Sequence, residues 1–169
     1  MRYLLLVCWL LLSGCLSVPD GVAPVQTFEL DRYLGRWYEV ARLDHSFERG
    51  LEAITADYSL RDDGGIRVIN SGRDIDSGEI QQAEGKAYFV QDSTIGHLKV
   101  SFFGPFYGSY VIFELDQIDY QFAFVAGNST DYLWLLARTP KVSQDLISQF
   151  EKSALELGFD IDKLIFVKH

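Results

Sequence analysis

Residues 31–39 read Asp-Arg-Tyr-Leu-Gly-Arg-Trp-Tyr-Glu and stand at the head of the part of the chain that we expect to fold. From Trp37 to Arg138, short runs of β-branched and aromatic residues follow one another, separated at regular intervals by turn residues. This pattern is typical of an all-β barrel or sandwich, and no long helical period interrupts it. The nine residues therefore mark the approach to the first strand.

The clearest local prediction is a hairpin. Residues 53–60 read as a strand, Asp62-Asp63-Gly64-Gly65 as a tight turn, and residues 66–70 as the returning strand with alternating apolar residues. Further strands are predicted at 84–90, 97–102, 109–115, 120–126 and 132–138. With the strand at Trp37 these make about eight, the number whose closed barrel can hold one small ligand. The short turns favour an up-and-down meander.

One amphipathic helix is predicted after the last barrel strand. Its apolar residues recur at helical spacing and are Leu146, Ile147, Phe150, Ala154 and Leu157. Ser143 is the expected N-terminal cap, and Gly158 is the expected stop. Residues 164–167 then predict a short extra strand.

The first residues form a separate unit. Met1 and Arg2 give a basic start, and residues 3–12 are uncharged and strongly apolar but too few to span a bilayer as a mature helix. They end in Leu12-Ser13-Gly14-Cys15, which resembles the lipobox of bacterial lipoprotein signal peptides. The resemblance implies cleavage after Gly14 and a lipid on Cys15. A plain secretory signal with a leftover thiol and an uncleaved anchor are the alternatives.

The expected organisation is a signal peptide over 1–14, a lipidated cysteine and flexible tether over 15–27, and one folded domain over 28–169. Cys8 lies in the segment that would be removed, so the mature domain would have no disulfide. In a bacterium with two membranes, a residue other than Asp after the cysteine, here Leu16, implies an anchored location in the outer membrane. The net charge of −9 argues against nucleic acid as a partner, because phosphate binding needs clustered Lys and Arg.

Three motifs in order resemble the signatures of the lipocalin family. Residues 31–39 resemble the opening signature, a helical turn followed by Gly35-x-Trp37. Residues 115–123 resemble the second signature, with a slightly longer turn, and residues 134–140 resemble the third, directly before the helix. The resemblance implies an eight-stranded antiparallel up-and-down barrel with one C-terminal α-helix. It also implies that Arg138 packs on Trp37 at the closed end, so Gly35, Trp37 and Arg138 are expected to serve the fold.

Residues 47–50 and 102–107 resemble more specifically the bacterial branch of that family, which is related to apolipoprotein D. This resemblance implies binding of a fatty acid or lysophospholipid. No cofactor and no metal are expected. Alternation along the first and last strands, anchored on Trp37 and Arg138, directs Glu39 and Tyr132 inward, and the resemblance to the apolipoprotein D type implies the same for Ala123. The expected ligand-binding residues are Ala41, Tyr58, Asn70, Val100, Phe102, Tyr110, Val125, Trp134 and Leu136. Of these, Tyr58 and Tyr110 are expected to lie closer to the polar head of the ligand, near the mouth of the barrel.

One alternative to a ligand cavity stays open, and so does the role of one loop. Aromatic side chains could simply fill the barrel, which would make the chain a structural or interaction module. The run Phe102, Phe103, Phe106 and Tyr107, broken by Gly and Pro, is expected to form a rim loop. Such a loop fits three roles: contact with membrane lipid, pairing of two barrels into a homodimer, or capping of the cavity.

No catalytic residue is predicted. Some lipocalins isomerise a lipid with a cysteine thiolate inside the barrel, and the mature barrel predicted here has no cysteine. His45, His97 and His169 match no metal-ligand spacing, and no Gly-x-Ser-x-Gly or phosphate loop occurs. An inward carboxylate pair or a Ser-His contact would favour a hydrolase or isomerase, and the sequence displays neither.

Overall fold

The computed structural model describes residues 16–169, so the expected signal peptide and Cys15 lie outside the described part of the chain. The barrel strands are β1 (Gly35–Arg42), β2 (Leu51–Leu60), β3 (Ile66–Asp74), β4 (Ile80–Phe89), β5 (His97–Ser101), β6 (Gly108–Leu115), β7 (Phe122–Ala126) and β8 (Leu133–Ala137). The remaining elements are the helical turn α1 (Leu30–Tyr33), the helix α2 (Gln144–Glu156), the 3₁₀ turn η1 (Ile161–Lys163) and the short strand β9 (Ile165–Phe166).

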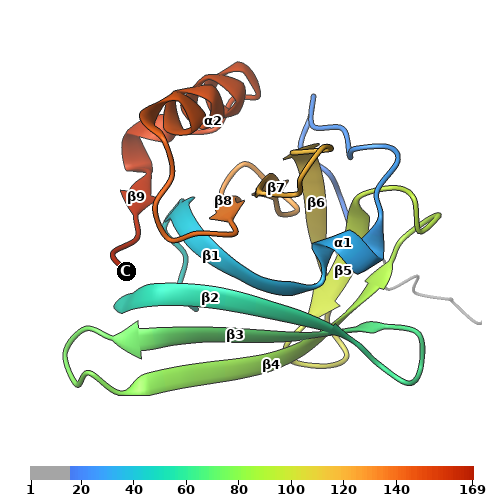
Figure 1. Ribbon diagram of the computed structural model, residues 1–169, viewed down its shortest axis with the longest axis horizontal. Coiled ribbons are helices and arrows are strands. Elements are labelled where there is room, and N and C mark those ends of the chain that lie inside the picture. The colour runs from blue at the N-terminus through green and yellow to red at the C-terminus, as the bar shows by residue number, and fades with distance from the viewer. Residues whose placement is uncertain (1–15) are drawn as a thin grey trace, which may run out of the picture.

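The strands form a closed antiparallel barrel because β1 pairs along both of its edges (Figure 1). Trp37 lies opposite Ala56 of β2, and Glu39 lies opposite Leu136 of β8. The other strands each pair with the next one along the chain, from β2 to β8. The predicted eight-stranded up-and-down barrel with one helix is confirmed.

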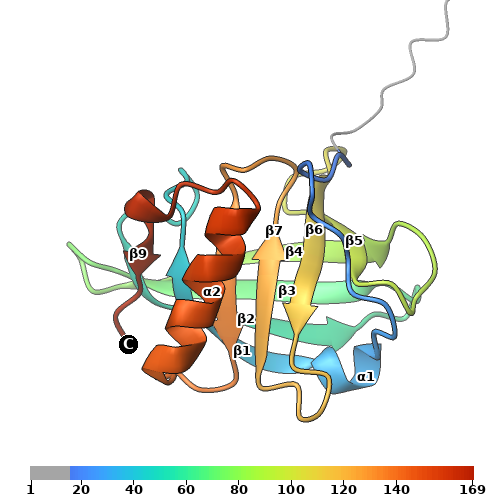
Figure 2. The ribbon, with the colours of Figure 1, turned by 90° about the horizontal axis from the view of Figure 1, so that it is seen from above.

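Strands β3 and β4 each extend four residues beyond the predicted bounds at the same end of their hairpin. β3 continues from Asn70 to Asp74, and β4 begins at Ile80 instead of Glu84. This end of the β3–β4 hairpin projects beyond the barrel (Figure 2), and the first five residues of β4 are exposed. Alternation of apolar and polar residues signals burial of one face, so a hairpin end that is wet on both faces carries no such signal.

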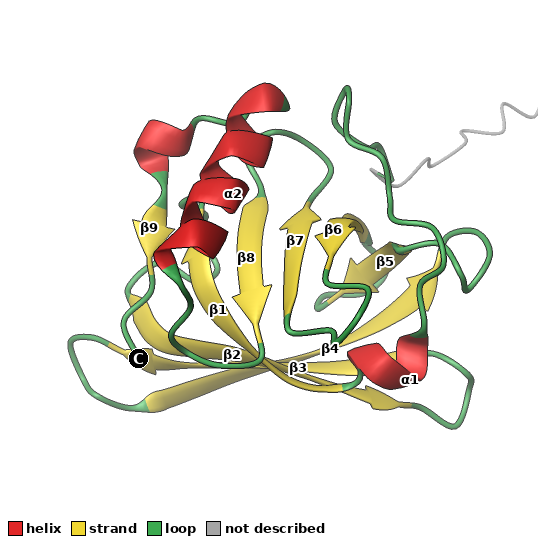
Figure 3. Cartoon of the chain, turned by 45° about the horizontal axis from the view of Figure 1, so that its top comes forward, coloured by secondary structure: helices red, strands yellow, loops and turns green. Residues whose placement is uncertain are grey.

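The helix α2 covers the outer face of β7, β8 and β1 (Figure 3). Phe150 and Ala154 are fully buried against this face, with Phe124 of β7 in edge contact with Phe150. The Ser143 hydroxyl accepts a hydrogen bond from the Leu146 amide at 3.2 Å, and Gly158 has a φ of 82° just after the helix ends. The predicted cap and stop are thus confirmed. Among residues 16–169, no helix is long and apolar enough to cross a membrane.

The stretch that the sequence predicted as a flexible tether is instead bonded to the barrel over much of its length. The Val25 amide donates to the carbonyl of Ile112 at 2.8 Å, and the Gly96 amide donates to the carbonyl of Val25 at 2.9 Å. Val22 is buried in the cluster beneath α2. The prediction failed because Pro and Gly indicate loop structure, whereas three valines at 18, 22 and 25 supply the apolar contacts.

One end of the barrel is closed by Trp37 and Arg138. The guanidinium carbon of Arg138 lies 3.9 Å from the centre of the Trp37 ring, and Trp37 is fully buried. Arg138 also donates to the backbone carbonyls of Tyr120, Arg36 and Arg32 at 3.2, 2.8 and 2.7 Å. A stacked guanidinium with satisfied donors is a favourable way to cover an indole face.

Gly35 begins β1 beside this closed end. Its φ of 90° lies in the region that side chains disfavour, and a Cβ there would stand 3.7 Å from an Arg138 nitrogen. The space would admit a methyl group, so the backbone conformation is what requires glycine.

Truncating the closed end should destabilise the protein. We expect Trp37→Ala to lower the free energy of unfolding by about 3–5 kcal/mol through lost burial and an unfilled cavity. Arg138→Ala should lower it less, and the pair should be coupled by roughly 1–2 kcal/mol. Urea unfolding of both single variants and the double variant measures these terms. Ile118→Ala, at a side chain that is 80% exposed, is the control. Additive losses would contradict the stacking contact.

Candidate ligand-binding site

The barrel encloses an apolar cavity of about 320 Å³ that opens at the end opposite Trp37. It falls within the range of small-molecule sites, roughly 300–1,000 Å³. Most of the expected ligand-binding residues border it: Tyr58, Asn70, Val100, Phe102, Tyr110, Trp134 and Leu136. Glu39 and Tyr132 also border it, as strand alternation predicted.

The expected inward orientation of Ala41 is wrong. A β-bulge lies between Glu39 and Ala41, so the alternation along β1 shifts by one residue at Val40. Ala41 therefore packs outward in the cluster beneath α2, and Arg42 takes the inward position beside Trp134. Strand alternation cannot anticipate this change, because a bulge leaves no periodic signal in eight residues.

Val125 and Ala123 face the barrel interior as expected but do not border the cavity. Val125 is fully buried between its strand partners Ile112 and Trp134, which carry larger side chains. It belongs to the packed wall and not to the open space.

Three tyrosines gather on the Trp37 side of the cavity. The Tyr110 hydroxyl lies 2.7 Å from the Tyr33 hydroxyl and 2.9 Å from the Tyr58 hydroxyl, and the Tyr33 ring packs 4.7 Å from Trp37. Burial is the main cause that raises the pKa of all three, so they are neutral hydrogen-bonding groups. The expectation that Tyr58 and Tyr110 lie near the mouth is therefore wrong, because their hydroxyls bond one another deep in the barrel.

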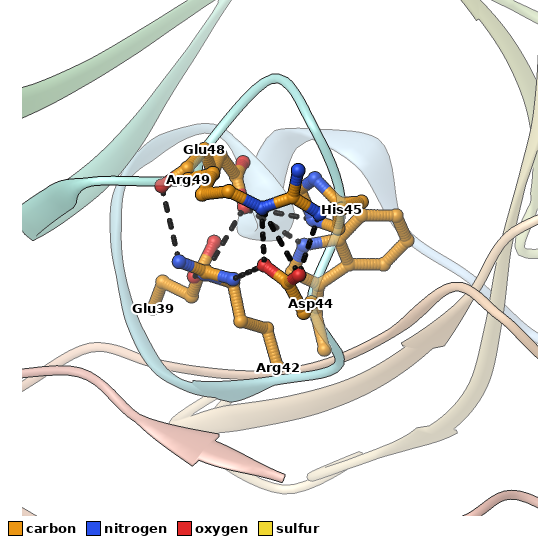
Figure 4. A network of polar contacts seen from close by, with 7 residues as sticks. Glu39, Arg42, Asp44, His45, Glu48 and Arg49 are labelled. Carbon is orange, nitrogen blue, oxygen red and sulfur yellow. Dashed lines mark hydrogen bonds and ion pairs between the residues drawn. The ribbon is translucent and has the colours of Figure 1, made fainter. Parts of the chain in front are cut away.

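The mouth instead carries a buried network of charged residues, which Figure 4 shows around Arg42. The Arg42 Nε lies 3.1 Å from the Glu39 carboxylate and 3.7 Å from the Glu48 carboxylate. A Glu48 oxygen lies 2.9 Å from His45 Nε2 and accepts a hydrogen bond from Trp134 Nε1 at 3.3 Å. Glu39 and Glu48 both border the cavity.

The β1–β2 loop is tied to this network. The Arg42 guanidinium donates to the backbone carbonyl of Glu48 at 3.0 Å and lies 3.6 Å from Asp44. Arg49 closes the loop with a 2.6 Å contact to the same Asp44. Arg42, His45 and Glu48 are not among the residues predicted to form the site, although the spacing of ionisable residues by three from Glu39 to Glu48 was an available signal.

The pKa values of Glu39 and Glu48 are shifted in opposite directions. Burial, and then repulsion from Glu48, raise the pKa of Glu39 well above its ordinary value, and Arg42 only partly opposes this. Burial alone would also raise the pKa of Glu48, but hydrogen bonds and charge from His45, with help from Trp134, lower it below the ordinary value. Glu48 is therefore the ionised member of the pair.

An inward carboxylate pair and a Ser–His contact, the two features that would favour an enzyme, each occur in part. Glu39 and Glu48 form an inward carboxylate pair, but both are engaged by Arg42. His97 Nε2 lies 3.5 Å from the Ser109 hydroxyl, and within residues 16–169 no acidic side chain bonds this histidine. Within the same residues, no cluster of His, Cys, Asp and Glu suited to a metal ion occurs. The absence of catalysis stays a prediction.

Removing the Glu39 carboxyl should flatten the dependence of stability on pH. A carboxyl whose pKa is raised by folding binds its proton more tightly in the folded state. Stability must therefore fall as pH rises from the unfolded value of about 4.3 towards the folded pKa. We expect the free energy of unfolding of Glu39→Gln to fall less over this window than that of the parent, as urea unfolding measures.

Glu84→Gln is the control for this prediction, because the Arg67 guanidinium lowers the pKa of that exposed carboxyl. Removing the Glu84 carboxyl should leave the decline in the free energy of unfolding with rising pH as large as in the parent. Equal declines in the parent and Glu39→Gln would contradict a raised Glu39 pKa.

Comparison with known proteins identifies the family. The model of the lipocalin-like domain family matches residues 28–169. The outer membrane lipoprotein Blc of Vibrio cholerae is 59% identical over 97% of this chain and 96% of its own length. Blc of Escherichia coli K12 is 54% identical over 89% of this chain and 84% of its own. These names agree with the predicted outer-membrane location.

A solved structure supports the same fold. Insecticyanin of the tobacco hornworm Manduca sexta superimposes with a TM-score of 0.71, at 20% identity, over 90% of this chain and 87% of that one. The match to the family model covers the whole barrel and helix, and both of these Blc proteins are more than 50% identical to this chain. The chain belongs to the lipocalin family.

Proposed function

We propose that this lipocalin binds one single-chain lipid, a fatty acid or a lysophospholipid, at the bacterial outer membrane. The observation that carries the proposal is the division of the cavity into an apolar interior and a polar mouth. Aliphatic and aromatic side chains line the interior, so an acyl chain enters with little loss of hydration. A filled barrel acting only as an interaction module is disfavoured, because the interior holds an open cavity of about 320 Å³.

The mouth favours a polar group that donates hydrogen bonds. Glu48 presents an ionised carboxylate to the cavity, and the Asn70 side-chain oxygen is buried without a partner among the described residues. A buried acceptor without a donor is unfavourable, and a ligand donor would satisfy it. A lysophospholipid carries a glycerol hydroxyl and, with an ethanolamine head, an ammonium group. The free carboxylate of a fatty acid carries no donor, so the lysophospholipid is the better fit.

Trp134 should report binding and contribute to it. Titrating delipidated protein with a lysophospholipid should change the tryptophan fluorescence saturably. Trp134→Ala should weaken binding by roughly 1–3 kcal/mol if the ring buries against the chain. Trp134→Glu should weaken it further, because it places an unpaired carboxylate beside Glu48 at the apolar wall.

The controls separate ligand and protein effects. Ile118→Glu, exposed on the β6–β7 loop, should bind like the parent. A fatty acid of matched chain length should bind more weakly than lysophosphatidylethanolamine, and Glu48→Gln should narrow that difference. If Trp134→Glu folds and binds lipid as tightly as the parent, the cavity is not the ligand site.

Membrane attachment through Cys15 is the second part of the proposal. It rests on the Leu12-Ser13-Gly14-Cys15 junction and on the lipoprotein names of both relatives. We expect Cys15→Ala to release the protein from membranes, because a multi-acyl anchor supplies the attachment. Fractionation in low and high salt measures this, with Ser13→Ala as the matched control. A variant that stays in the pellet under both conditions would contradict the anchor.

A further inference from the structure

Exposed apolar side chains gather at the mouth end of the barrel. Phe47 on the β1–β2 loop is 62% exposed, and Phe103 and Phe106 on the β5–β6 loop are 77% and 74% exposed. These three line a second hollow that shares Glu48, Asn70 and Phe102 with the lining of the cavity. They therefore form an aromatic rim directly around the opening.

The β5–β6 loop is the part of this rim best suited to an apolar environment. Residues 102–107 read Phe-Phe-Gly-Pro-Phe-Tyr, without a charged side chain. The turn of the β3–β4 hairpin, at the same end, also exposes Ile75 and Ile80, the first residue of β4, but this segment carries three acidic residues, Asp74, Asp76 and Glu79. A net charge of −9 gives the protein no general attraction to an anionic surface, so contact at this end would depend on the aromatic side chains.

The start of the described chain lies at this same end of the barrel, where β6 begins and β7 ends (Figure 2). The Ser17 hydroxyl donates to the backbone carbonyl of Asn128 at 2.9 Å, and Asn128 borders the cavity. Val18 and Val22 then pack against the cluster beneath α2. Only Leu16 separates Ser17 from Cys15, so the two Cα atoms are at most about 7 Å apart.

We propose that the mouth of the barrel rests against the membrane, with Phe47, Phe103 and Phe106 in the interfacial layer of the bilayer. The inference rests on the proposed lipid on Cys15, because Ser17, two residues further along the chain, is bonded to Asn128 at the mouth, so a lipid on Cys15 would hold this end of the barrel close to the bilayer. Aromatic side chains favour the membrane–water interface, and an exposed cluster of them marks an interaction surface. A lipid then passes between the bilayer and the cavity without crossing bulk water.

Tryptophan reporters test this orientation. Phe103→Trp and Phe106→Trp place a reporter on the rim, and Ile118→Trp places one at an 80% exposed position at the closed end. The full-length protein, extracted from membranes with its native modification, is reconstituted into phosphatidylethanolamine–phosphatidylglycerol vesicles containing brominated acyl chains. We expect several-fold stronger quenching and a shift to shorter emission wavelength at 103 and 106, unchanged by salt, and neither effect at 118.

Each other outcome overturns the inference. Equal quenching at 103 and 118 means that the mouth does not face the bilayer. Burial of the 103 reporter without bromolipid quenching, together with a dimer in sedimentation, means that the rim pairs two copies of the chain. Mass spectrometry that finds no acyl group on Cys15 removes the anchor on which the orientation depends.

Failure of the orientation is distinguishable from failure of lipid binding. The double variant Phe103→Ser/Phe106→Ser should bind lysophospholipid in vesicle-free solution as the parent does, because neither residue borders the cavity. The same variant should take up lipid from vesicles several-fold more slowly. Failure of the parent to bind lysophospholipid in solution contradicts the proposed function, whereas unchanged uptake from vesicles by the double variant contradicts the orientation alone.

Discussion

The stacking of the Arg138 guanidinium on the Trp37 indole closes one end of the barrel, and the form of the cavity depends on it. Arg138 follows the last barrel strand, and its three backbone acceptors come from α1, β1 and the β6–β7 loop. One side chain thus joins the segments that converge at this end. Because the buried ring fills the base, the space above it opens at the far end, and a long ligand must place its polar part there.

The charged network at that far end combines two tasks. Burying ions is unfavourable unless each one is paired, and here Arg42 is surrounded by Glu39, Asp44 and Glu48. The same contacts hold the β1–β2 loop, since Arg42 also binds a backbone carbonyl of that loop. The groups that define the shape of the rim are therefore the groups that a ligand meets first, and altering one alters both properties.

Residue patterns anticipated the strands, the helix with its cap and stop, and most of the cavity lining. Periodicity succeeds where one face of a strand is buried, as in the β2–β3 hairpin, and fails where both faces are wet, as at the start of β4. Simple alternation placed Ala41 inside the barrel, but the bulge at Val40 places Arg42 there instead. The charged network around Arg42 was therefore not predicted. The meeting of Tyr33, Tyr58 and Tyr110 depends on three-dimensional proximity across separate elements, which no spacing in the chain encodes.

The pairing of β1 also bears on when the barrel can form. β1 needs β8, which lies about a hundred residues later, and its last residues, beyond those that pair with β2, are paired by Ile165 and Phe166. The Ala53 amide bonds the Lys168 carbonyl as well. Contacts so distant along the chain are slow to form, because a long loop must be closed before any of them stabilises the fold. A partly emerged chain therefore cannot complete its barrel, which closes only when β8 and the last residues of the chain are available to β1 and β2.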